Sequence, residues 1–235
     1  MKKTVFILTV ILFAISASAL AQKQKLWNQP YADHKLYHFG FHVGMHTQDL
    51  ILTNNGIATP DGETWFAELP YYNPGFSVGV IGDLFLNPYM NLRAIPTIHF
   101  GDKTIVFKET ASEEEKRISL RSNYLDVPLN IKISSMRMNN CRPYIIGGAY
   151  GAIELGQKKG NLLLLKPIDY GVEFGLGCTF YLPYFRLAPE IKFKFGLPDI
   201  LEKNRVDLPN EQDKIFTNAL SKVTSRMIVF TFNFE

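Results

Sequence analysis

The sequence predicts an all-β protein: an eight-stranded antiparallel transmembrane outer-membrane β-barrel with an up-and-down meander. Three observations predict it. Apolar and polar residues alternate with a period of two, which is typical of strands and excludes helices. The alternating stretches run to about a dozen residues, a length that suits a tilted bilayer crossing. Short connections also alternate with long ones. The alternative is a soluble β-sandwich, but its strands average about five or six residues.

The clearest alternation covers residues 170–182 and resumes after a tight turn at residues 183–184. One face of these two stretches is mostly apolar and consists of Tyr170, Val172, Phe174, Leu176, Cys178, Phe180, Leu182, Phe185, Leu187, Ile191, Phe193 and Phe195. The other face carries glycines and charged residues. In an outer-membrane barrel the apolar face meets lipid and the polar face lines the interior.

The N-terminus predicts a secretory signal peptide over residues 1–21. Two lysines precede an apolar run at residues 5–15, and Ala19-Leu20-Ala21 forms an A-x-A cleavage site. That run is too short to span a membrane as a helix. We therefore expect export to the outer membrane, a periplasmic lead-in over residues 22–36 and a barrel domain over residues 37–235.

The first half of the barrel is expected to contain strands at residues 37–48, 75–86, 90–100 and 120–133. Turn signals indicate a long loop between the first two strands, at residues 49–74. A tight turn at residues 87–89 follows the second strand. Pro96 lacks an N–H group, so it must lie at a bulge or a break in pairing. A charge run within residues 101–119 indicates a solvated loop.

The second half is expected to contain strands at residues 142–154, 170–182, 185–195 and 224–234. A short turn at residues 138–140 precedes them, and longer loops are expected at residues 155–166 and 197–223. The last loop is compatible with a short helix at residues 211–220. With both termini in the periplasm, every long loop lies outside the cell and every short turn lies in the periplasm.

A barrel of eight strands has an interior just large enough for side chains. We therefore expect a packed lumen rather than a porin channel. The polar residues predicted to form a charge network inside it are Arg93, Asp126, Lys132, Glu173, Arg186, Glu190, Lys192 and Lys194. Function is then expected to reside in the loops, the rim or the lipid-facing wall.

Three histidines, His38, His42 and His46, share the polar face of the first strand and suggest a metal site. Residues four apart on a strand are separated by roughly 13 Å, which one metal ion cannot bridge. A lumen lined by histidine and glycine is the simpler interpretation. We expect no bound metal and no cofactor.

Catalysis is not expected. Lipid-modifying barrel enzymes use a serine with a histidine and an acid on the outer wall, whereas His38, His42, His46 and His99 are predicted to face inward. No Gly-x-Ser-x-Gly or zinc motif is present. The net charge of +3 is too small to argue for nucleic acid. Outer-membrane lipids are the expected surroundings, and no small-molecule substrate is expected.

The chain contains two cysteines, Cys141 and Cys178. The oxidising periplasm would permit a disulfide between them. Cys141 is expected in a periplasmic turn, and Cys178 is expected to face outward part of the way along a strand. From these positions we expect two unpaired thiols.

Five stretches, taken together and in order, carry a family resemblance: LYHFGFHVG (36–44), NLRAIPTIHFGDK (91–103), SNYLDVPLNIK (122–132), MRMNNCRPYIIGGAYG (136–151) and DYGVEFGLGCTFYLPYFRLAPEIKFKFGLPDIL (169–201). With them the mature chain resembles the PorT family of Bacteroidetes outer-membrane proteins, components of the type IX (Por) secretion system. The resemblance implies a role in exporting cargo with a C-terminal signal domain, together with other secretion-system proteins. It implies no catalytic residues. The chain departs from many barrels in that Glu235 follows the terminal aromatic Phe234.

The function therefore remains open between two main alternatives. One is a non-enzymatic component of type IX secretion, and the other is a generic small barrel for surface adhesion or membrane stabilisation. A lipid-modifying enzyme is a third and weaker alternative. Aromatic residues dominate interface hot spots, so the candidate partner contacts in the first long loop are Trp65, Phe66, Tyr71 and Tyr72. Membership of the interfacial aromatic girdle explains the same residues equally well.

Overall fold

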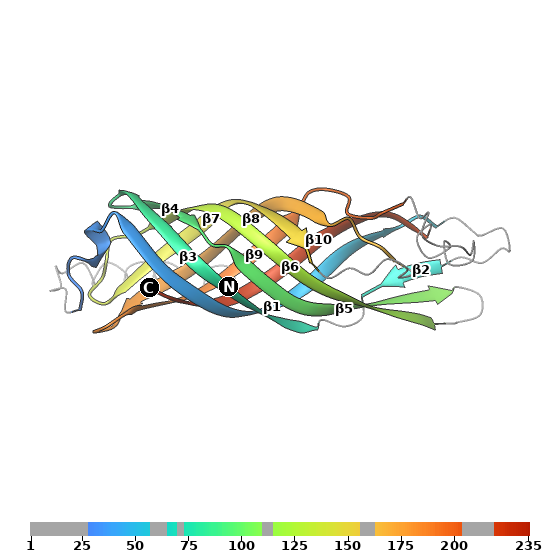
Figure 1. Cartoon of the computed structure of the whole chain (residues 1–235), viewed down its shortest axis with the longest axis horizontal. Coiled ribbons are helices and arrows are strands. Elements are labelled where there is room, and N and C mark those ends of the chain that lie inside the picture. The colour runs from blue at the N-terminus through green and yellow to red at the C-terminus, as the bar shows by residue number, and fades with distance from the viewer. Residues whose placement is uncertain (1–27, 57–64, 70–72, 110–114, 156–162, 204–218) are drawn as a thin grey trace, which may run out of the picture.

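The computed structural model describes residues 28–56, 65–69, 73–109, 115–155, 163–203 and 219–235. The predicted signal peptide lies outside these residues. A short 3-10 helix, η1 (Ala32–His34), precedes ten strands: β1 (Tyr37–Asn54), β2 (Trp65–Glu68), β3 (Pro74–Asn87), β4 (Met90–Ala94), β5 (Thr97–Glu109), β6 (Glu115–Ser134), β7 (Cys141–Glu154), β8 (Ile168–Tyr181), β9 (Arg186–Gly196) and β10 (Leu220–Phe234). The strands tilt around one elongated barrel (Figure 1).

The sheet closes on itself through β1. This strand pairs with β10 on one side and with β3 on the other, and both ladders are antiparallel. From β10 the ring continues through β9, β8, β7 and β6 and returns to β3 through β4 and β5. Closure leaves these walls without a free edge. The predicted class, an all-β antiparallel barrel with a meander topology, is confirmed.

The count of ten strands differs from the predicted eight for two local reasons. The strand expected at residues 90–100 is divided into β4 and β5 at Pro96, which has no N–H to donate, although its carbonyl oxygen still accepts the N–H of Val80 at 3.0 Å. Both halves lie between β3 and β6, so they make one wall of the barrel. The second difference is β2, a short strand of the first long loop that pairs with β5.

Several strands continue past their predicted ends on the side of the long connections. β1 extends to Asn54, and β5 and β6 form one hairpin that is paired as far as Lys108 and Glu115. Part of the charge run expected in a loop therefore belongs to β6. Of the short helix considered at residues 211–220, only the last two residues are described, and Leu220 begins β10. We name this side the loop end, and the side of the connections β3–β4, β6–β7 and β8–β9 the short-turn end.

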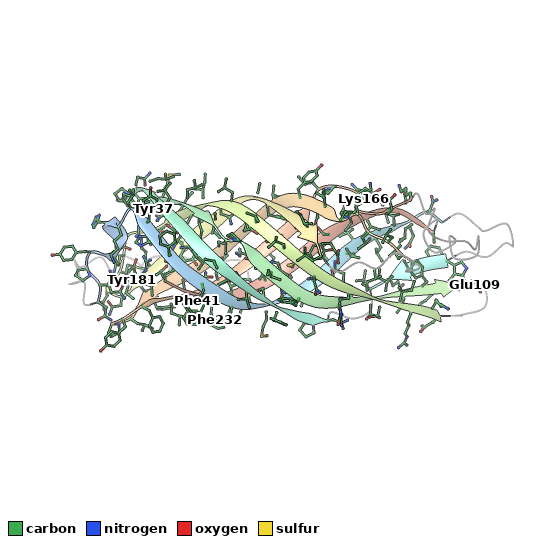
Figure 2. All side chains as sticks on the ribbon, in the orientation of Figure 1. Tyr37, Phe41, Glu109, Lys166, Tyr181 and Phe232 are labelled. Carbon is green, nitrogen blue, oxygen red and sulfur yellow. A yellow bond between two sulfur atoms is a disulfide. The ribbon has the colours of Figure 1, made fainter. Side chains whose placement is uncertain are left out.

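Apolar side chains cover the outside of the barrel (Figure 2). Phe39 is 75% exposed and Phe41 53% exposed on β1, and Phe232 is 41% exposed on β10. Polar residues on the same strands, such as His42 of β1 and Thr231 and Asn233 of β10, are buried. This arrangement is the reverse of a soluble protein and typical of a lipid-facing wall. Among the described residues, no helix is long and apolar enough to cross a membrane.

Tight contact between neighbouring strands depends on glycine at a few positions. A Cβ atom at Gly171 of β8 would lie 2.0 Å from the carbonyl oxygen of Phe195 on β9. At Gly148 of β7 it would lie 2.1 Å from the carbonyl oxygen of Leu129 on β6. No real Cβ contact is that short, so these two positions require glycine for the strands to approach as they do.

Candidate functional site: a packed lumen and its two ends

Buried ion pairs fill the middle of the lumen. Glu173 of β8 lies between two lysines of β9, with Lys194 Nζ 3.0 Å from its Oε2 and Lys192 Nζ 4.0 Å from its Oε1. Lys194 also pairs with Asp126, and Lys192 Nζ lies 3.3 Å from Glu190 Oε1. Charges in a low-dielectric interior are costly unless they are paired and hydrogen-bonded. The alternation of acid and base is what allows these side chains to remain inside.

A second charge cluster lies nearer the short-turn end. Arg93 of β4 is fully buried, and its Nε lies 2.7 Å from Asp83 Oδ2 on β3. Its Nη2 donates to Glu235, whose other carboxylate oxygen lies 2.9 Å from Arg186 Nη2. The side chain of Glu235 is thereby held inside the barrel between β4 and β9. This cluster connects strands from opposite ends of the sequence.

The eight predicted interior residues are all buried in the structure, and none is more than 7% exposed: Arg93, Asp126, Lys132, Glu173, Arg186, Glu190, Lys192 and Lys194. Seven of them belong to the ion pairs just described. The eighth, Lys132, has its Nζ 4.3 Å from the centre of the Tyr144 ring. The prediction missed Asp83, Lys103 and Glu235, which are also buried. Glu235 continues the alternation of inward-facing residues along β10, so this alternation could have identified it as an interior residue.

Little space remains between these side chains. A cavity lined by Lys103, Asp126 and Lys194 has a volume of about 20 Å³. A second cavity, lined by His38 and Glu235, has a volume of about 10 Å³. One water molecule needs about 10–15 Å³. Each of these two cavities has room for single water molecules and not for a solute.

The lumen also contains the histidines that suggested a metal site. His42 Nε2 lies 2.9 Å from Thr97 Oγ1, and His46 Nε2 lies 3.0 Å from Gln48 Nε2. His99 Nε2 lies 3.4 Å from Asp126 Oδ2. Within the described ranges no three side chains are grouped as a metal site would require. Each of these three rings instead has a polar neighbour from the lumen, and His38 lines the small cavity beside Glu235.

The loop end of the lumen is filled by apolar side chains. They come from β1, β2, β5, β6 and β10 and from the connections between strands. The buried members are Leu50, Ala67, Ile105, Phe107, Ile118, Leu120, Leu163, Leu165, Ile200, Leu201, Ala219, Leu220 and Val223. This cluster lies beyond the polar network along the barrel axis. It extends the packed interior into the part of the barrel that carries the long loops.

Asp199 ties the β9–β10 connection to β10. Its carboxylate accepts the N–H groups of Leu201 at 3.2 Å and of Val223 at 3.0 Å, and Lys203 Nζ lies 3.3 Å away. Burial alone would raise the pKa of this carboxyl. The two backbone hydrogen bonds and the lysine outweigh burial and hold the pKa of Asp199 below its ordinary value.

Residues 28–36, the described part of the expected lead-in, fold across the short-turn end. Asp33 of η1 lies 3.0 Å from Arg142 Nη1 and accepts the hydroxyl of Tyr181. Arg137 donates to the carbonyl oxygens of Gln29, at 3.0 Å, and of Asn28, and its guanidinium lies 3.5 Å from the centre of the Tyr181 ring. Burial lowers the pKa of Arg137, but an arginine stays charged at neutral pH. These contacts hold the described part of the lead-in against the barrel.

Arg137→Ala is expected to release this segment without unfolding the barrel. Hydrogen bonds from a charged donor contribute about 1.5–3 kcal/mol each, so local opening of residues 28–36 should become at least about tenfold more frequent. Amide hydrogen exchange of these residues measures the opening. Arg117→Ala, which removes an exposed arginine of β6, is the control. Unchanged protection in the Arg137 variant would show that other contacts hold the segment.

The cysteines correct one prediction. Cys141 and Cys178 form a disulfide, with Cα atoms 6.6 Å apart, so the expectation of two unpaired thiols was wrong. Cys141 is not in a turn but begins β7, and Pro143 is directly opposite Cys178 on β8. The two cysteines are therefore diagonal neighbours on the same face of two paired strands. The register between the strands decides this proximity.

Two of the four predicted partner contacts lie in the described part of the chain. Trp65 is partly buried and packs against the apolar cluster at the loop end. Phe66, its neighbour on β2, is 38% exposed. Tyr71 and Tyr72 lie outside the described residues. Of the two described side chains, Phe66 is the more accessible.

A closed barrel with an apolar outer wall and a polar, packed interior is the architecture of an integral outer-membrane protein. Residues 20–202 match the family described as "Outer membrane protein beta-barrel domain". The chain belongs to this family, and its place is the outer membrane. No curated protein matches the sequence.

Solved outer-membrane proteins resemble this chain, and one of them, with a TM-score above 0.5, supports the fold. The barrel is similar to the outer membrane protein OprG from Pseudomonas aeruginosa, at 12% identity over 83% of this chain and 93% of that one, with a TM-score of 0.51. The N-terminal β-barrel domain of Pseudomonas aeruginosa OprF matches at 10% identity over 83% and 96% of the two chains, with a TM-score of 0.34. Ail of Yersinia pestis matches at 12% identity over 83% and 96%, with a TM-score of 0.35. At these identities the likeness concerns the fold alone.

Proposed function

We propose that this outer-membrane barrel is a non-enzymatic component of the type IX (Por) secretion system, needed for export of cargo with a C-terminal signal domain. The five stretches that resemble the PorT family support this assignment. One structural observation supports the manner of action, namely that buried ion pairs and apolar side chains occupy the lumen. Cargo cannot pass through such a barrel, so the protein acts by contacting other secretion proteins.

The two ends of the barrel offer surfaces for such contacts. At the short-turn end Tyr184 is 96% exposed, Tyr31 80% and Met136 72%. At the loop end Phe66 is exposed on β2. Large apolar side chains exposed outside the lipid-facing wall are typical of protein-interaction sites. The short turns of an outer-membrane barrel face the periplasm, so the short-turn end is the first surface to test for a partner.

Deletion of the gene tests the proposal directly. The expected result is that cargo with a C-terminal signal domain accumulates in the periplasm as unprocessed precursor. Cell fractionation followed by immunoblotting measures it. A plasmid copy of the wild-type gene should restore surface display, and periplasmic proteins without the signal should not change. Normal cargo at the cell surface of the deletion strain would refute the secretion role.

A generic small barrel in surface adhesion or membrane stabilisation is the second candidate. The observation that favours it is the long β5–β6 hairpin, paired from Thr97 and Asp126 to Lys108 and Glu115. Normal export combined with reduced adhesion or detergent resistance in the deletion strain would support this alternative. A lipid-modifying enzyme is disfavoured because His38, His42, His46 and His99 are buried rather than exposed on the outer wall.

A further inference from the structure

An unpaired strand edge lies at the loop end. β6 begins at Glu115, but its ladder with β7 starts only at Tyr124, which pairs with Glu154. Just beyond this pair, the N–H of Leu155 donates to the carbonyl oxygen of Asn123 at 2.7 Å. Within the part of the chain that the structure describes, no further backbone group pairs with β6 on this side. β5 pairs with the other side of β6 as far as Glu115, so the projecting stretch is an edge strand held by one neighbour (Figure 1).

The backbone groups that face this edge belong to Arg117, Ser119 and Arg121. The carbonyl oxygen of Asn123 points to the β7 side, and in a regular strand the N–H and C=O groups of every second residue point the same way. The register between β5 and β6 is continuous along the whole hairpin, so the alternation holds over the edge. Each of the three residues therefore offers one donor and one acceptor to an incoming strand.

The side chains of the same three residues point away from the lumen. Ile118 and Leu120, which alternate with them, belong to the apolar cluster at the loop end. The side chain of Arg117 is 62% exposed and that of Arg121 is 77% exposed. Each guanidinium lies 3.5–4.0 Å from an exposed carboxylate of the same hairpin, and surface ion pairs of this kind are weak. A carboxylate of an incoming strand would therefore meet little competition at either arginine.

We propose that this edge of β6 is a docking site for an extended acidic segment of another protein outside the cell. The segment adds to the sheet as a strand, with its backbone bonded to residues 117, 119 and 121 and its carboxylates opposite the two arginines. Strand addition supplies affinity through main-chain hydrogen bonds and specificity through alternate side chains. The loop end of an outer-membrane barrel faces outside, where such a partner would be met.

The charges of the edge favour an acidic partner over a second copy of this chain. Two β6 edges paired antiparallel over the same three residues would place Arg117 directly opposite Arg121. Like charges opposite one another destabilise a strand pair, whereas opposite charges stabilise it. The site is independent of the secretion role, because no step of the test involves export of cargo.

Fluorescence anisotropy of a labelled peptide with the purified barrel in lipid nanodiscs tests the site. The probe is Val-Glu-Val-Thr-Val-Glu-Val, which places glutamates opposite the two arginines and threonine opposite Ser119. It should bind saturably, and about tenfold more tightly than Val-Lys-Val-Thr-Val-Lys-Val, because two cross-strand charge pairs change from attraction to repulsion. The double variant Arg117→Gln with Arg121→Gln should remove that preference. Empty nanodiscs measure the background from lipid.

Changes to the backbone separate strand addition from simple attraction of charge. N-methylation of the threonine removes an N–H that faces β6 and should abolish binding, whereas N-methylation of an adjacent valine, whose N–H faces away, should not. In the barrel, Ser119→Pro removes an N–H that faces the edge and leaves the hydrogen bonds to β5 intact. This variant should lose the peptide, and Ser119→Ala, which keeps the N–H, should bind it like the wild type.

Heat-modifiable migration on gels checks that every variant is a folded barrel. Failure of the wild type to bind the acidic peptide, or equal binding of the two peptides, would overturn the proposal. Retained binding in Ser119→Pro, or of the threonine-methylated peptide, would also overturn it, because charge alone would then attract the probe. A wild-type dimer that Ser119→Pro converts to a monomer would assign the edge to a second copy of this chain instead.

Discussion

Replacing Arg93 by methionine is expected to destabilise the barrel by about 3–5 kcal/mol, the usual cost of removing one partner from a buried ion pair. Arg93 is fully buried and pairs with both Asp83 and Glu235. Methionine fills much of the same volume, so the loss of stability comes from electrostatics rather than from a cavity. Asp83 is left buried without its ion-pair partner, and Glu235 keeps its ion pair with Arg186. Urea unfolding in micelles, followed by tryptophan fluorescence, measures the change.

Two further variants separate the ion pair from general damage. Arg121→Met removes an arginine that is 77% exposed and should change the free energy of unfolding by less than about 0.5 kcal/mol. The double variant Arg93→Met with Asp83→Asn should be more stable than Arg93→Met alone, because no unpaired carboxylate remains. Wild-type resistance to urea in the Arg93 single variant would mean that the cluster does not contribute to closure.

Removal of the disulfide is the second large effect. Replacing Cys141 and Cys178 by serine should lower the free energy of unfolding by about 3–4 kcal/mol, because the chain-entropy model assigns that much to a loop of this size. The bond joins positions 37 residues apart and restricts the conformations of the unfolded chain. The pairing of β7 with β8 does not depend on it, so the folded barrel should persist in the variant.

Reduction and alkylation provide the control. The wild-type protein should take up no alkylating agent without reductant and two equivalents after reduction in denaturant. Reductant should lower the urea midpoint of the wild type and leave the double serine variant unchanged. Alkylation of the native protein without reductant would contradict the disulfide.

An ion-pair cluster, a disulfide and a set of hydrogen bonds stabilise different parts of the chain at the short-turn end. Glu235 joins β4 to β9 through Arg93 and Arg186, the disulfide joins β7 to β8, and Arg137 holds residues 28 and 29. The loop end is instead packed with apolar side chains, to which Trp65 adds. The described part of the short-turn end is therefore held in place before any contact is made, and the proposed binding of a partner there would carry a low entropic cost.

Alternation along the sequence was enough to predict where most strands lie and which face each of their residues occupies. A period of two fixes side-chain direction once one face must meet lipid, and a slip of one residue would place Glu173 or Lys194 in hydrocarbon. For the same reason the alternation placed the interior residues of β6, β8 and β9 without any knowledge of their partners. Pro96 likewise predicted a break in strand pairing, because the missing N–H group is a local property of the residue.

Which of these residues contact one another could be learned only from the folded barrel. Arg93 and Glu235 are 142 positions apart and become neighbours only when β1 and β10 close the ring. The pairing of Cys141 with Cys178 depends on the register between β7 and β8, which alternation within one strand does not specify. The loop-end cluster combines residues from several strands. Periodicity is a property of one strand, whereas contacts depend on closure, tilt and register, which arise from the pairing of all strands together.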